Sequence, residues 1–253
     1  VAFVAERVFK VEELIDYVDR HWPAEQEGVE GRRYETGIMV ADPHIRFNIR
    51  YILGRRLMRL NRWKEAIPYM PKRYHNQCKR LGQSIDIGND RTQPDELRAE
   101  NLWRAAYILR YDGIVLIGAA NEPDWLVGFV GSPFGIEARN REWDTDAPFS
   151  PSDDEIERIA DSIILPNKRF HYRYTAAEVG WMAAKLMPDN SPETARVLCQ
   201  SGTWLKNSDL QAADVFYKEL VNRCRKTEMG QIADQLKWFP QIDRQGQLVR
   251  VEH

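Results

Sequence analysis

The sequence is short of cysteine, histidine, net charge and long apolar runs, and each shortage excludes a class of protein. Its 253 residues include three cysteines and five histidines without CxxC, HxxxH or HxH spacing, so we expect no metal site and no cofactor. The formal net charge of −2 favours neither nucleic acid nor a charged membrane surface as a partner. No run approaches the roughly 20 apolar residues of a membrane-spanning helix, so we expect no transmembrane segment.

The remaining composition is that of a folded globular protein with many aromatic residues. Hydrophobic residues make up 43% and charged residues 29% of the sequence. Eight tryptophans and ten tyrosines favour a large interior or an aromatic binding surface. The sequence starts at Val1, and "VAFVAERVF" is not a complete signal peptide, so we expect it to be processed, trimmed or incomplete at its start.

The three cysteines are predicted to be small buried apolar side chains. An alternative stays open for Cys199 and Cys224, which fall on successive predicted helices. They would pair in an oxidising compartment, but sequence spacing alone does not set the geometry of a disulfide.

Helical periodicity dominates the sequence and predicts an all-α fold. Asp42 and Ser152 are expected N-caps, and Gly113 is expected to end a helix. Pro68 and Pro71 should distort or divide the helix that contains them. The expected helices cover 11–22, 42–60, 62–81, 93–113, 152–164, 169–187, 192–206, 208–224 and 227–237.

Changes in composition divide the sequence into five segments. We predict an N-terminal helix and linker over 1–37, helical hairpins over 38–120, an irregular insertion over 121–152, further helices over 153–240 and a tail over 241–253. The insertion is rich in glycine and proline, and its tryptophan and phenylalanine content favours a packed loop. A small extended segment is expected in the tail.

An internal repeat is the most specific pattern in the sequence. In "LGRRLMRLNRWKEAIPYM" (53–70), small, apolar, turn and aromatic residues recur at set intervals, namely Gly54, Leu57, Asn61, Trp63, Ala66 and Met70. This segment resembles a tetratricopeptide repeat (TPR), in which small residues let two antiparallel helices approach closely. "LWRAAYILRYDGIVLIG" (102–118) and "SGTWLKNSDLQAADVFY" (201–217) resemble it less closely, and "TAAEVGWMAAKLMPDN" (175–190) resembles the closing half of a repeat.

The resemblance implies an α-solenoid of TPR-like helical hairpins, because a single hairpin cannot bury its apolar face without stacked neighbours. It also implies a bacterial-type, non-catalytic scaffold for protein–protein interaction, or a subunit of a larger assembly. "ADVFYKELVNRCRKTEMGQIADQLKWF" (213–239) resembles the last repeat of TPR proteins of bacterial cell envelopes. That likeness favours a periplasmic or envelope location over the cytoplasm.

TPR proteins bind partners mostly through a concave face, which is lined by the first helix of each pair. Transferred to this sequence, the exposed inner positions are rich in Tyr, Trp and Arg, the residue types of interface hot spots. Arginines suit an acidic peptide or the C-terminus of a protein as the ligand. The predicted partner-binding residues are Tyr51, Arg55, Met58, Arg59, Trp103, Tyr107, Arg110 and Tyr111.

Two other interpretations concern the same arginines. The "EWDTD" of the insertion (142–146) could fold into the groove and pair with them itself. The arginines of 46–62 have no acidic residue among them, but they occupy two helix faces, so no nucleic-acid partner is expected.

A glycoside hydrolase is the alternative function. Asn121-Glu122-Pro123 follows the apolar run "IVLI", and Glu178 precedes Gly-Trp, which resembles the catalytic strands of retaining (β/α)₈-barrel glycosidases. Such a barrel needs eight strands alternating with helices. The sequence offers at most one or two strand-like runs, so we disfavour catalysis by Glu122 and Glu178 and expect no catalytic residues.

Overall fold

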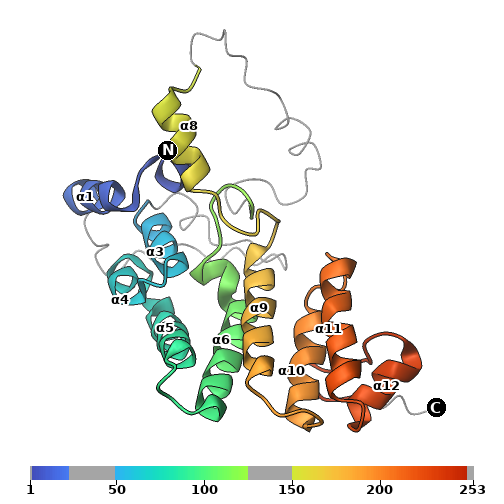
Figure 1. Ribbon diagram of the computed structural model, residues 1–253. Coiled ribbons are helices and arrows are strands. Elements are labelled where there is room, and N and C mark those ends of the chain that lie inside the picture. The colour runs from blue at the N-terminus through green and yellow to red at the C-terminus, as the bar shows by residue number, and fades with distance from the viewer. Residues whose placement is uncertain (1, 23–48, 125–149, 250–253) are drawn as a thin grey trace, which may run out of the picture. The chain divides into compact units, whose positions relative to one another are not determined.

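A computed structural model describes residues 2–22, 49–124 and 150–249, and these residues are all-α (Figure 1). No strand forms among them, and a single isolated antiparallel bridge joins Ile242 to Leu248. None of the described helices is long and apolar enough to cross a membrane. The protein forms two compact units, each built from two stretches of sequence. Unit 1 comprises Val1–His75 and Ile117–His171, and unit 2 comprises Asn76–Leu116 and Tyr172–His253.

Helix α3 is the centre of unit 1. It is contacted by η1 (Val4–Val8), α1 (Val11–His21), α4 (Trp63–Ala66) and the 3₁₀ turn η2 (Ile67–Tyr69), and η1 also contacts α8 (Asp153–Asp161). A second 3₁₀ turn, η3 (Lys72–Tyr74), follows η2. Helix α3 spans Ile49–Arg59, and three of its apolar side chains are fully buried, namely Ile52, Leu53 and Leu57.

The first predicted hairpin is present in unit 1 as α3 and α4. Asn61 has the positive φ of 57° that reverses the backbone direction between them. A Cβ on Gly54 would lie 2.7 Å from the Sδ atom of Met70 and 3.2 Å from the carbonyl carbon of Tyr69. Gly54 is therefore small because the returning segment passes directly against it, as the repeat pattern predicts.

The two prolines interrupt the second helix of this hairpin as expected. Helix α4 ends at Ala66, Pro68 lies in the turn η2, and Pro71 precedes η3. A proline lacks the backbone donor of a helix and crowds the preceding turn. Regular α-helix therefore resumes only after both prolines, at α5 (His75–Asn89).

Replacing Gly54 by leucine should lower the free energy of unfolding by about 1–3 kcal/mol, because the new methyl groups would enter space held by Met70 and Tyr69. Urea denaturation followed by circular dichroism measures the change. Lys79→Leu adds the same residue at an exposed position of α5 and should change stability by less than about 0.5 kcal/mol. Equal effects of the two substitutions would show that Gly54 is not a close-contact position.

Unit 2 is a series of helices that pack closely against one another at glycines. It contains α5, α6 (Asp95–Leu116), α9 (His171–Lys185), α10 (Pro192–Thr203), α11 (Leu210–Arg223) and α12 (Glu228–Leu236). In each successive pair from α5 to α11, a Cβ added to one glycine would collide with the neighbouring helix. The pairs are Gly88 with Leu102, Gly113 with Tyr172, Gly180 with Ser201 and Gly202 with Phe216. Figure 1 shows α6 and α9 lying side by side within this unit.

The predicted helix end at Gly113 is wrong. Helix α6 continues through Gly113 to Leu116, so residues 102–118 are not a hairpin. A Cβ at Gly113 would lie 2.7 Å from a ring carbon of Tyr172. Gly113 allows α6 and α9 to pack closely. Its spacing in the sequence is the same for a glycine at a helix contact as for one that ends a helix.

The weaker match at 201–217 corresponds to a real helix pair with one departure. Helices α10 and α11 pack together, and Trp204 and Ala213 are 7% and 0% exposed. Leu210, which matches the aromatic position of the repeat, is 66% exposed and does not fill the space beside the helices. The repeat pattern therefore accounts for the helix pair but not for its whole interface.

Several local predictions are confirmed and others lie outside the described residues. Ser152 caps α8 and accepts a hydrogen bond from the Glu155 amide. All three cysteines are buried free thiols, so Cys199 and Cys224 do not pair. The bridge between Ile242 and Leu248 is the extended segment expected in the tail. Asp42, the linker 25–37 and residues 125–149 of the insertion, with its "EWDTD" segment, lie outside the described residues.

Candidate functional site

The eight predicted partner-binding residues fall into the two units. Helix α3 of unit 1 carries four of them, Tyr51, Arg55, Met58 and Arg59. Helix α6 of unit 2 carries the other four, Trp103, Tyr107, Arg110 and Tyr111. The surroundings of the two groups differ.

The expectation that the α3 residues are exposed is wrong. Tyr51, Arg55 and Met58 are 2%, 1% and 7% exposed, and the Arg59 side chain is 13% exposed. Helix α3 is covered by η1, α1, α4 and η2, Tyr51 stacks on Tyr74, and η1 brings Glu6 to Arg59 in a short ion pair. The family pattern assumes that these positions are open to solvent, whereas here they are buried within unit 1.

Glu6 is the centre of a buried ionic network in unit 1. Its side chain is fully buried, and besides Arg59 it accepts a hydrogen bond of 3.0 Å from the Ala120 amide. Arg59 also donates to the Ile117 carbonyl at 3.0 Å. Burial would raise the pKa of Glu6, but Arg59 and Arg55 hold that pKa below its ordinary value. Glu6 is therefore a buried carboxylate that depends on its arginine partners.

Asp124 anchors the residues that follow the Asn-Glu-Pro motif. It accepts hydrogen bonds from the Ala119 amide at 2.8 Å and from the His171 amide at 3.2 Å. The Nδ1 atom of His171 lies 2.8 Å from the same carboxylate, and both side chains are buried. Sequence reasoning examined Glu122 in this motif and missed Asp124, which the structure uses to tie 117–124 to His171.

The two carboxylates of the glycosidase alternative lie in surroundings unlike those of a barrel. Glu122 is half-buried in unit 1, near Arg7. Burial lowers the pKa of the Arg7 guanidinium, and the charge of Glu122 opposes part of that shift. Glu178 is exposed on helix α9. Neither follows a strand, since the described residues contain none, so the barrel that would join these carboxylates is missing from the described part of the protein.

The predicted residues of α6 do form a half-buried aromatic and cationic surface in unit 2. Trp103 stacks on Trp204 of the α10 end, with ring centroids 5.6 Å apart and planes at 4°. The Arg196 guanidinium lies 5.6 Å from the Trp103 ring centroid. The rings of Tyr107 and Tyr111 have centroids 4.5 Å apart along the same helix.

Two guanidiniums lie over the ring of Tyr111, one from α6 and one from the C-terminal turn. Arg110 lies 5.2 Å and Arg244 4.3 Å from its centroid. The turn is held in place because Gln200 donates to the Arg244 carbonyl at 2.7 Å and the Tyr111 hydroxyl donates to it at 3.4 Å. These contacts fix Arg244 against α6.

The charges around Arg110 are mostly of one sign. Burial lowers the pKa of Arg110, and the neighbouring Arg173 and Arg244 lower it further. The Arg110 Nε atom is buried and finds no hydrogen-bond acceptor in the described residues. Asp112 is a nearby carboxylate, and burial raises its pKa although Arg244 and Arg80 oppose the rise. This surface, called the α6 cluster below, consists of Trp103, Tyr107, Arg110, Tyr111, Arg173, Arg196, Trp204 and Arg244.

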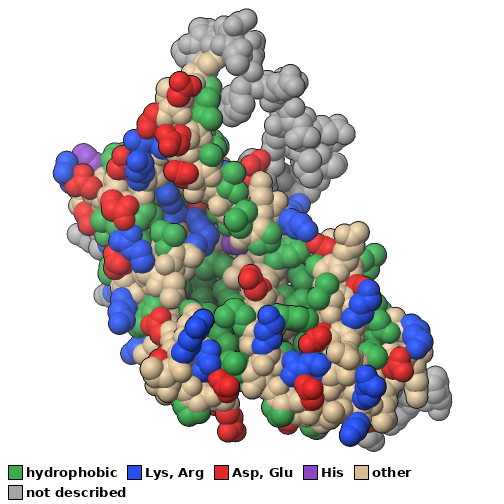
Figure 2. Space-filling model, in the orientation of Figure 1, with side chains coloured by type: hydrophobic (Ala, Val, Ile, Leu, Met, Phe, Trp, Pro, Cys, Tyr) green, Lys and Arg blue, Asp and Glu red, His purple; other side chains and the backbone are tan. Residues whose placement is uncertain are grey.

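Half of the α6 cluster was beyond prediction from sequence. The four residues of α6 were found because they share one helix and one spacing. Arg173, Arg196, Trp204 and Arg244 come from α9, from α10 and its end, and from the tail, so only the packing of those segments brings them to α6. On the face shown in Figure 2, many acidic and basic side chains are interspersed.

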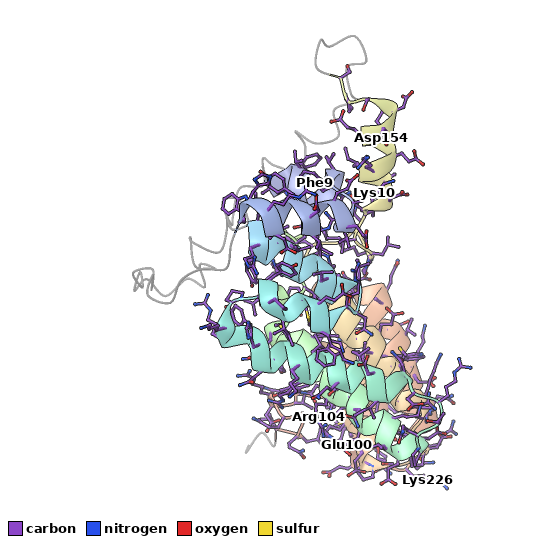
Figure 3. All side chains as sticks on the ribbon, turned by 90° about the vertical axis from the view of Figure 1, so that its left-hand side faces the viewer. Phe9, Lys10, Glu100, Arg104, Asp154 and Lys226 are labelled. Carbon is purple, nitrogen blue, oxygen red and sulfur yellow. The ribbon has the colours of Figure 1, made fainter. Side chains whose placement is uncertain are left out.

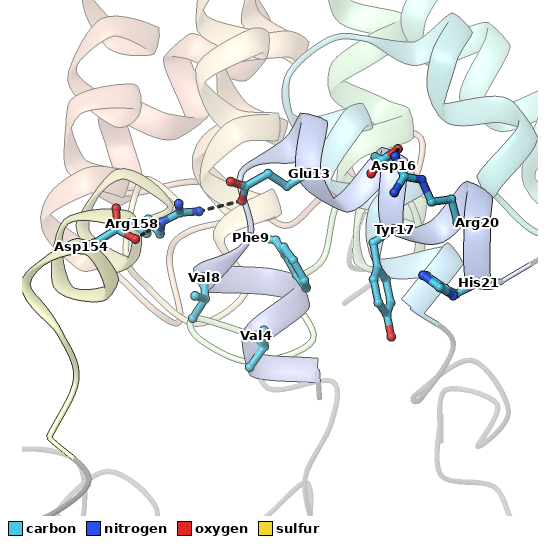
Figure 4. Close-up of a pocket in the computed structure, with 10 residues that line it drawn as sticks. All are labelled: Val4, Val8, Phe9, Glu13, Asp16, Tyr17, Arg20, His21, Asp154 and Arg158. Atoms are coloured by element: carbon cyan, nitrogen blue, oxygen red, sulfur yellow. Dashed lines mark hydrogen bonds and ion pairs between the residues drawn. The ribbon is translucent and has the colours of Figure 1, made fainter.

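A shallow pocket of about 440 Å³ lies in unit 1 among η1, α1 and α8 (Figure 4). Phe9 and Tyr17 form its aromatic wall, with ring centroids 5.6 Å apart. Its charged residues pair with one another, as in the 2.6 Å contact between Glu13 and Arg158. This mutual pairing leaves the pocket without the concentration of like charge that marks the α6 cluster.

The comparisons with known proteins identify no relative. No family model matches the sequence, and neither a curated protein nor a solved structure matches it. Among the described residues, no three His, Cys, Asp or Glu side chains are grouped to hold a metal ion. The function is therefore argued from the geometry of the α6 cluster.

Proposed function

We propose that this protein is a non-catalytic, TPR-like interaction protein that binds an acidic segment of a partner protein at the α6 cluster. It would act as a scaffold or as a subunit of a larger assembly. The gathering of Arg173 and Arg244 around Arg110 carries the proposal. Two of the three, Arg110 and Arg244, lie over the ring of Tyr111.

The TPR-like part of the proposal is supported by the use of small residues between helices. Gly54 separates the two arms of the α3–α4 hairpin, and glycines occupy the closest approach of each successive pair from α5 to α11. Stacked hairpins need such positions, because neighbouring helices cover each other's apolar faces only at short separation. The long helix α6 departs from a regular repeat, so the likeness lies in the packing mode.

The acidic partner is supported by the electrostatics of the cluster. Like charges held together at a partly desolvated surface raise the free energy of the unbound protein. A carboxylate that binds there reduces the repulsion between them. A guanidinium offers carboxylates two parallel donors, and the Arg110 Nε has no acceptor within the described residues. Trp103 and Tyr107 add aromatic surface of the kind that dominates binding energy in interfaces.

The double substitution Arg110→Gln/Arg244→Gln should weaken binding of an acidic partner at least about tenfold, because truncating a charged contact at an interface costs about 2–5 kcal/mol or more. Two readouts measure this. One is fluorescence anisotropy with a labelled octaglutamate peptide, and the other is quantitative capture of binding proteins from extract of the source cell.

Arg104→Gln is the matched control, since Arg104 lies on the same helix but is exposed and paired with Glu100 at 2.7 Å (Figure 3). It should retain wild-type affinity. Circular dichroism confirms that the variants are folded. Unchanged affinity of the double variant, or an equal loss in Arg104→Gln, would refute the assignment of the α6 cluster.

A further inference from the structure

The most unusual polar group of unit 1 is a fully buried guanidinium, that of Arg55. This residue is 1% exposed, and its guanidinium lies over the Tyr51 ring, 4.4 Å from the centroid. Stacking covers a face of this planar group, whereas its five N–H donors lie in the plane. Its Nε is buried without an acceptor in the described residues. Burying a charged group raises the free energy of the folded protein unless acceptors are present for its hydrogen bonds.

Two further donors of unit 1 are in the same situation. The Nη1 atom of Arg7 and the Nδ2 atom of Asn121 are buried, and neither has an acceptor within the described residues. Arg7 as a residue is 5% exposed. With Arg55, these groups come from three separate segments, namely η1, α3 and the stretch after α6. All three would gain from an acceptor supplied by a ligand.

The three donors belong to segments that meet at Glu6. Arg7 follows Glu6 directly in η1, and Asn121 follows Ala120, whose amide donates to Glu6 at 3.0 Å. Arg55 lies one helical turn before Arg59, which pairs with Glu6. Burial would raise the pKa of Glu6, but Arg59 and Arg55 hold it below its ordinary value. The unsatisfied donors therefore belong to one neighbourhood within unit 1.

The charges of this neighbourhood leave a positive excess. Its described cations are Arg7, Arg55, Arg56 and Arg59, and its buried or half-buried described carboxylates are Glu6, Glu122 and Asp124. Glu12 also acts on Arg56, but it is 74% exposed and pairs with Arg62. Both Oε atoms of Glu6 are engaged, one by Arg59 and the other by the Ala120 amide. Among the described residues, Arg55 thus has neither a dedicated counter-ion nor an acceptor for its Nε, and an anion would supply both.

We propose that unit 1 binds a small tetrahedral oxyanion, with Arg55 and Arg7 as its principal donors and Asn121 as a third. A tetrahedral anion carries oxygens in several directions and so suits donors supplied by three separate segments, whereas a planar carboxylate offers two oxygens. The ligand is a phosphate or sulfate ion, or the phosphoryl group of a small metabolite. The site is separate from the α6 cluster and does not depend on the function proposed for it.

The test is isothermal titration calorimetry of the whole protein with sodium phosphate, sodium sulfate and glycerol phosphate, at an ionic strength held constant with sodium chloride. Saturable binding of at least one of them is expected. Arg55→Gln should weaken it at least about tenfold, as expected for the loss of a charged donor. Arg62→Gln is the control, because Arg62 lies in the same unit but pairs with Glu12 and Glu65 near the surface.

A second variant keeps the test informative if Arg55→Gln does not fold. Asn121→Ala removes an amide donor without changing the charge, and it should weaken binding several-fold while the circular dichroism spectrum stays that of the wild type. Binding of inorganic phosphate or sulfate supports a free ion as ligand, and binding of glycerol phosphate alone supports a phosphorylated metabolite. Absence of saturable binding of all three ligands, or equal affinities in Asn121→Ala and wild type, would overturn the proposal.

Discussion

Replacing Glu6 by glutamine is expected to lower the free energy of unfolding by about 3–5 kcal/mol, the usual cost of removing one partner from a buried ion pair. The carboxylate is fully buried, and its pair with Arg59 holds η1 on α3. Glutamine has nearly the same shape but no charge. The guanidiniums of Arg55, Arg56 and Arg59 would then remain near one another without that carboxylate.

Chemical denaturation of Glu6→Gln measures this loss, and Glu12→Gln is the matched control. Glu12 also pairs with an arginine of unit 1, Arg62, but its side chain is 74% exposed. Exposed pairs contribute about 0–1 kcal/mol, so the control should be close to wild type. Similar losses in both variants would show that the network around Glu6 is not buried in solution.

The same carboxylate gives the protein a pH dependence of defined sign. The pKa of Glu6 is lower in the folded protein than its ordinary value, so the folded state binds the proton less tightly than the unfolded state. The stabilisation is therefore fully present above the ordinary pKa of a glutamate, about 4.3, and is lost as the pH falls through the lower folded value. The stability difference between wild type and Glu6→Gln should be constant near neutrality and shrink in acid.

Substituting Gly230 by alanine should destabilise the protein by about 1–3 kcal/mol, as overpacking typically does. A Cβ on Gly230 would contact the Cys224 carbonyl oxygen and lie 2.6 Å from its carbon. A backbone carbonyl is held by the peptide plane and does not rotate aside, so the start of α12 would have to move. That movement would also disturb the N-cap, where Thr227 accepts from the Gly230 amide at 3.1 Å.

Gln231→Ala is the control for this prediction, because it places the same residue at an exposed position of the same helix. Alanine favours a helix over glycine by about 1 kcal/mol, so an unobstructed Gly230→Ala variant would be more stable than wild type. The direction of the change in the urea midpoint therefore shows whether overpacking or helix propensity dominates at position 230. A higher midpoint for Gly230→Ala would contradict the packing of α12 against Cys224.

Local rules of helix formation were readable in the sequence. Pro68 and Pro71 interrupt the helix where they stand, and Ser152 caps the helix that follows it. Gly54 was identified from its spacing to Ala66, because close helix contact demands small side chains wherever it occurs. Such features depend on a few neighbouring residues and need no knowledge of the rest of the fold.

Features that depend on distant segments were missed. The role of Gly113 is set by Tyr172, almost sixty residues further along the sequence. Arg55 was expected on an open face, but η1, whose residues precede it by more than forty positions, contacts α3 in this unit. Likewise the α6 cluster is completed by Arg173 and Arg244, which no periodicity of α6 can indicate.

The discontinuous make-up of unit 1 has a consequence for its synthesis. The hydrogen bond from Ala120 to Glu6 spans 114 residues, and the stretch that supplies Ala120 follows the first part of unit 2 in the sequence. At about 5–20 residues per second, a ribosome needs roughly 6–23 s to bridge that interval. Helix α3 ends roughly 60 residues before Ala120, so for about the last 3–12 s of that interval the nascent Glu6 and Arg59 lack the Ala120 amide and the Ile117 carbonyl that complete their network.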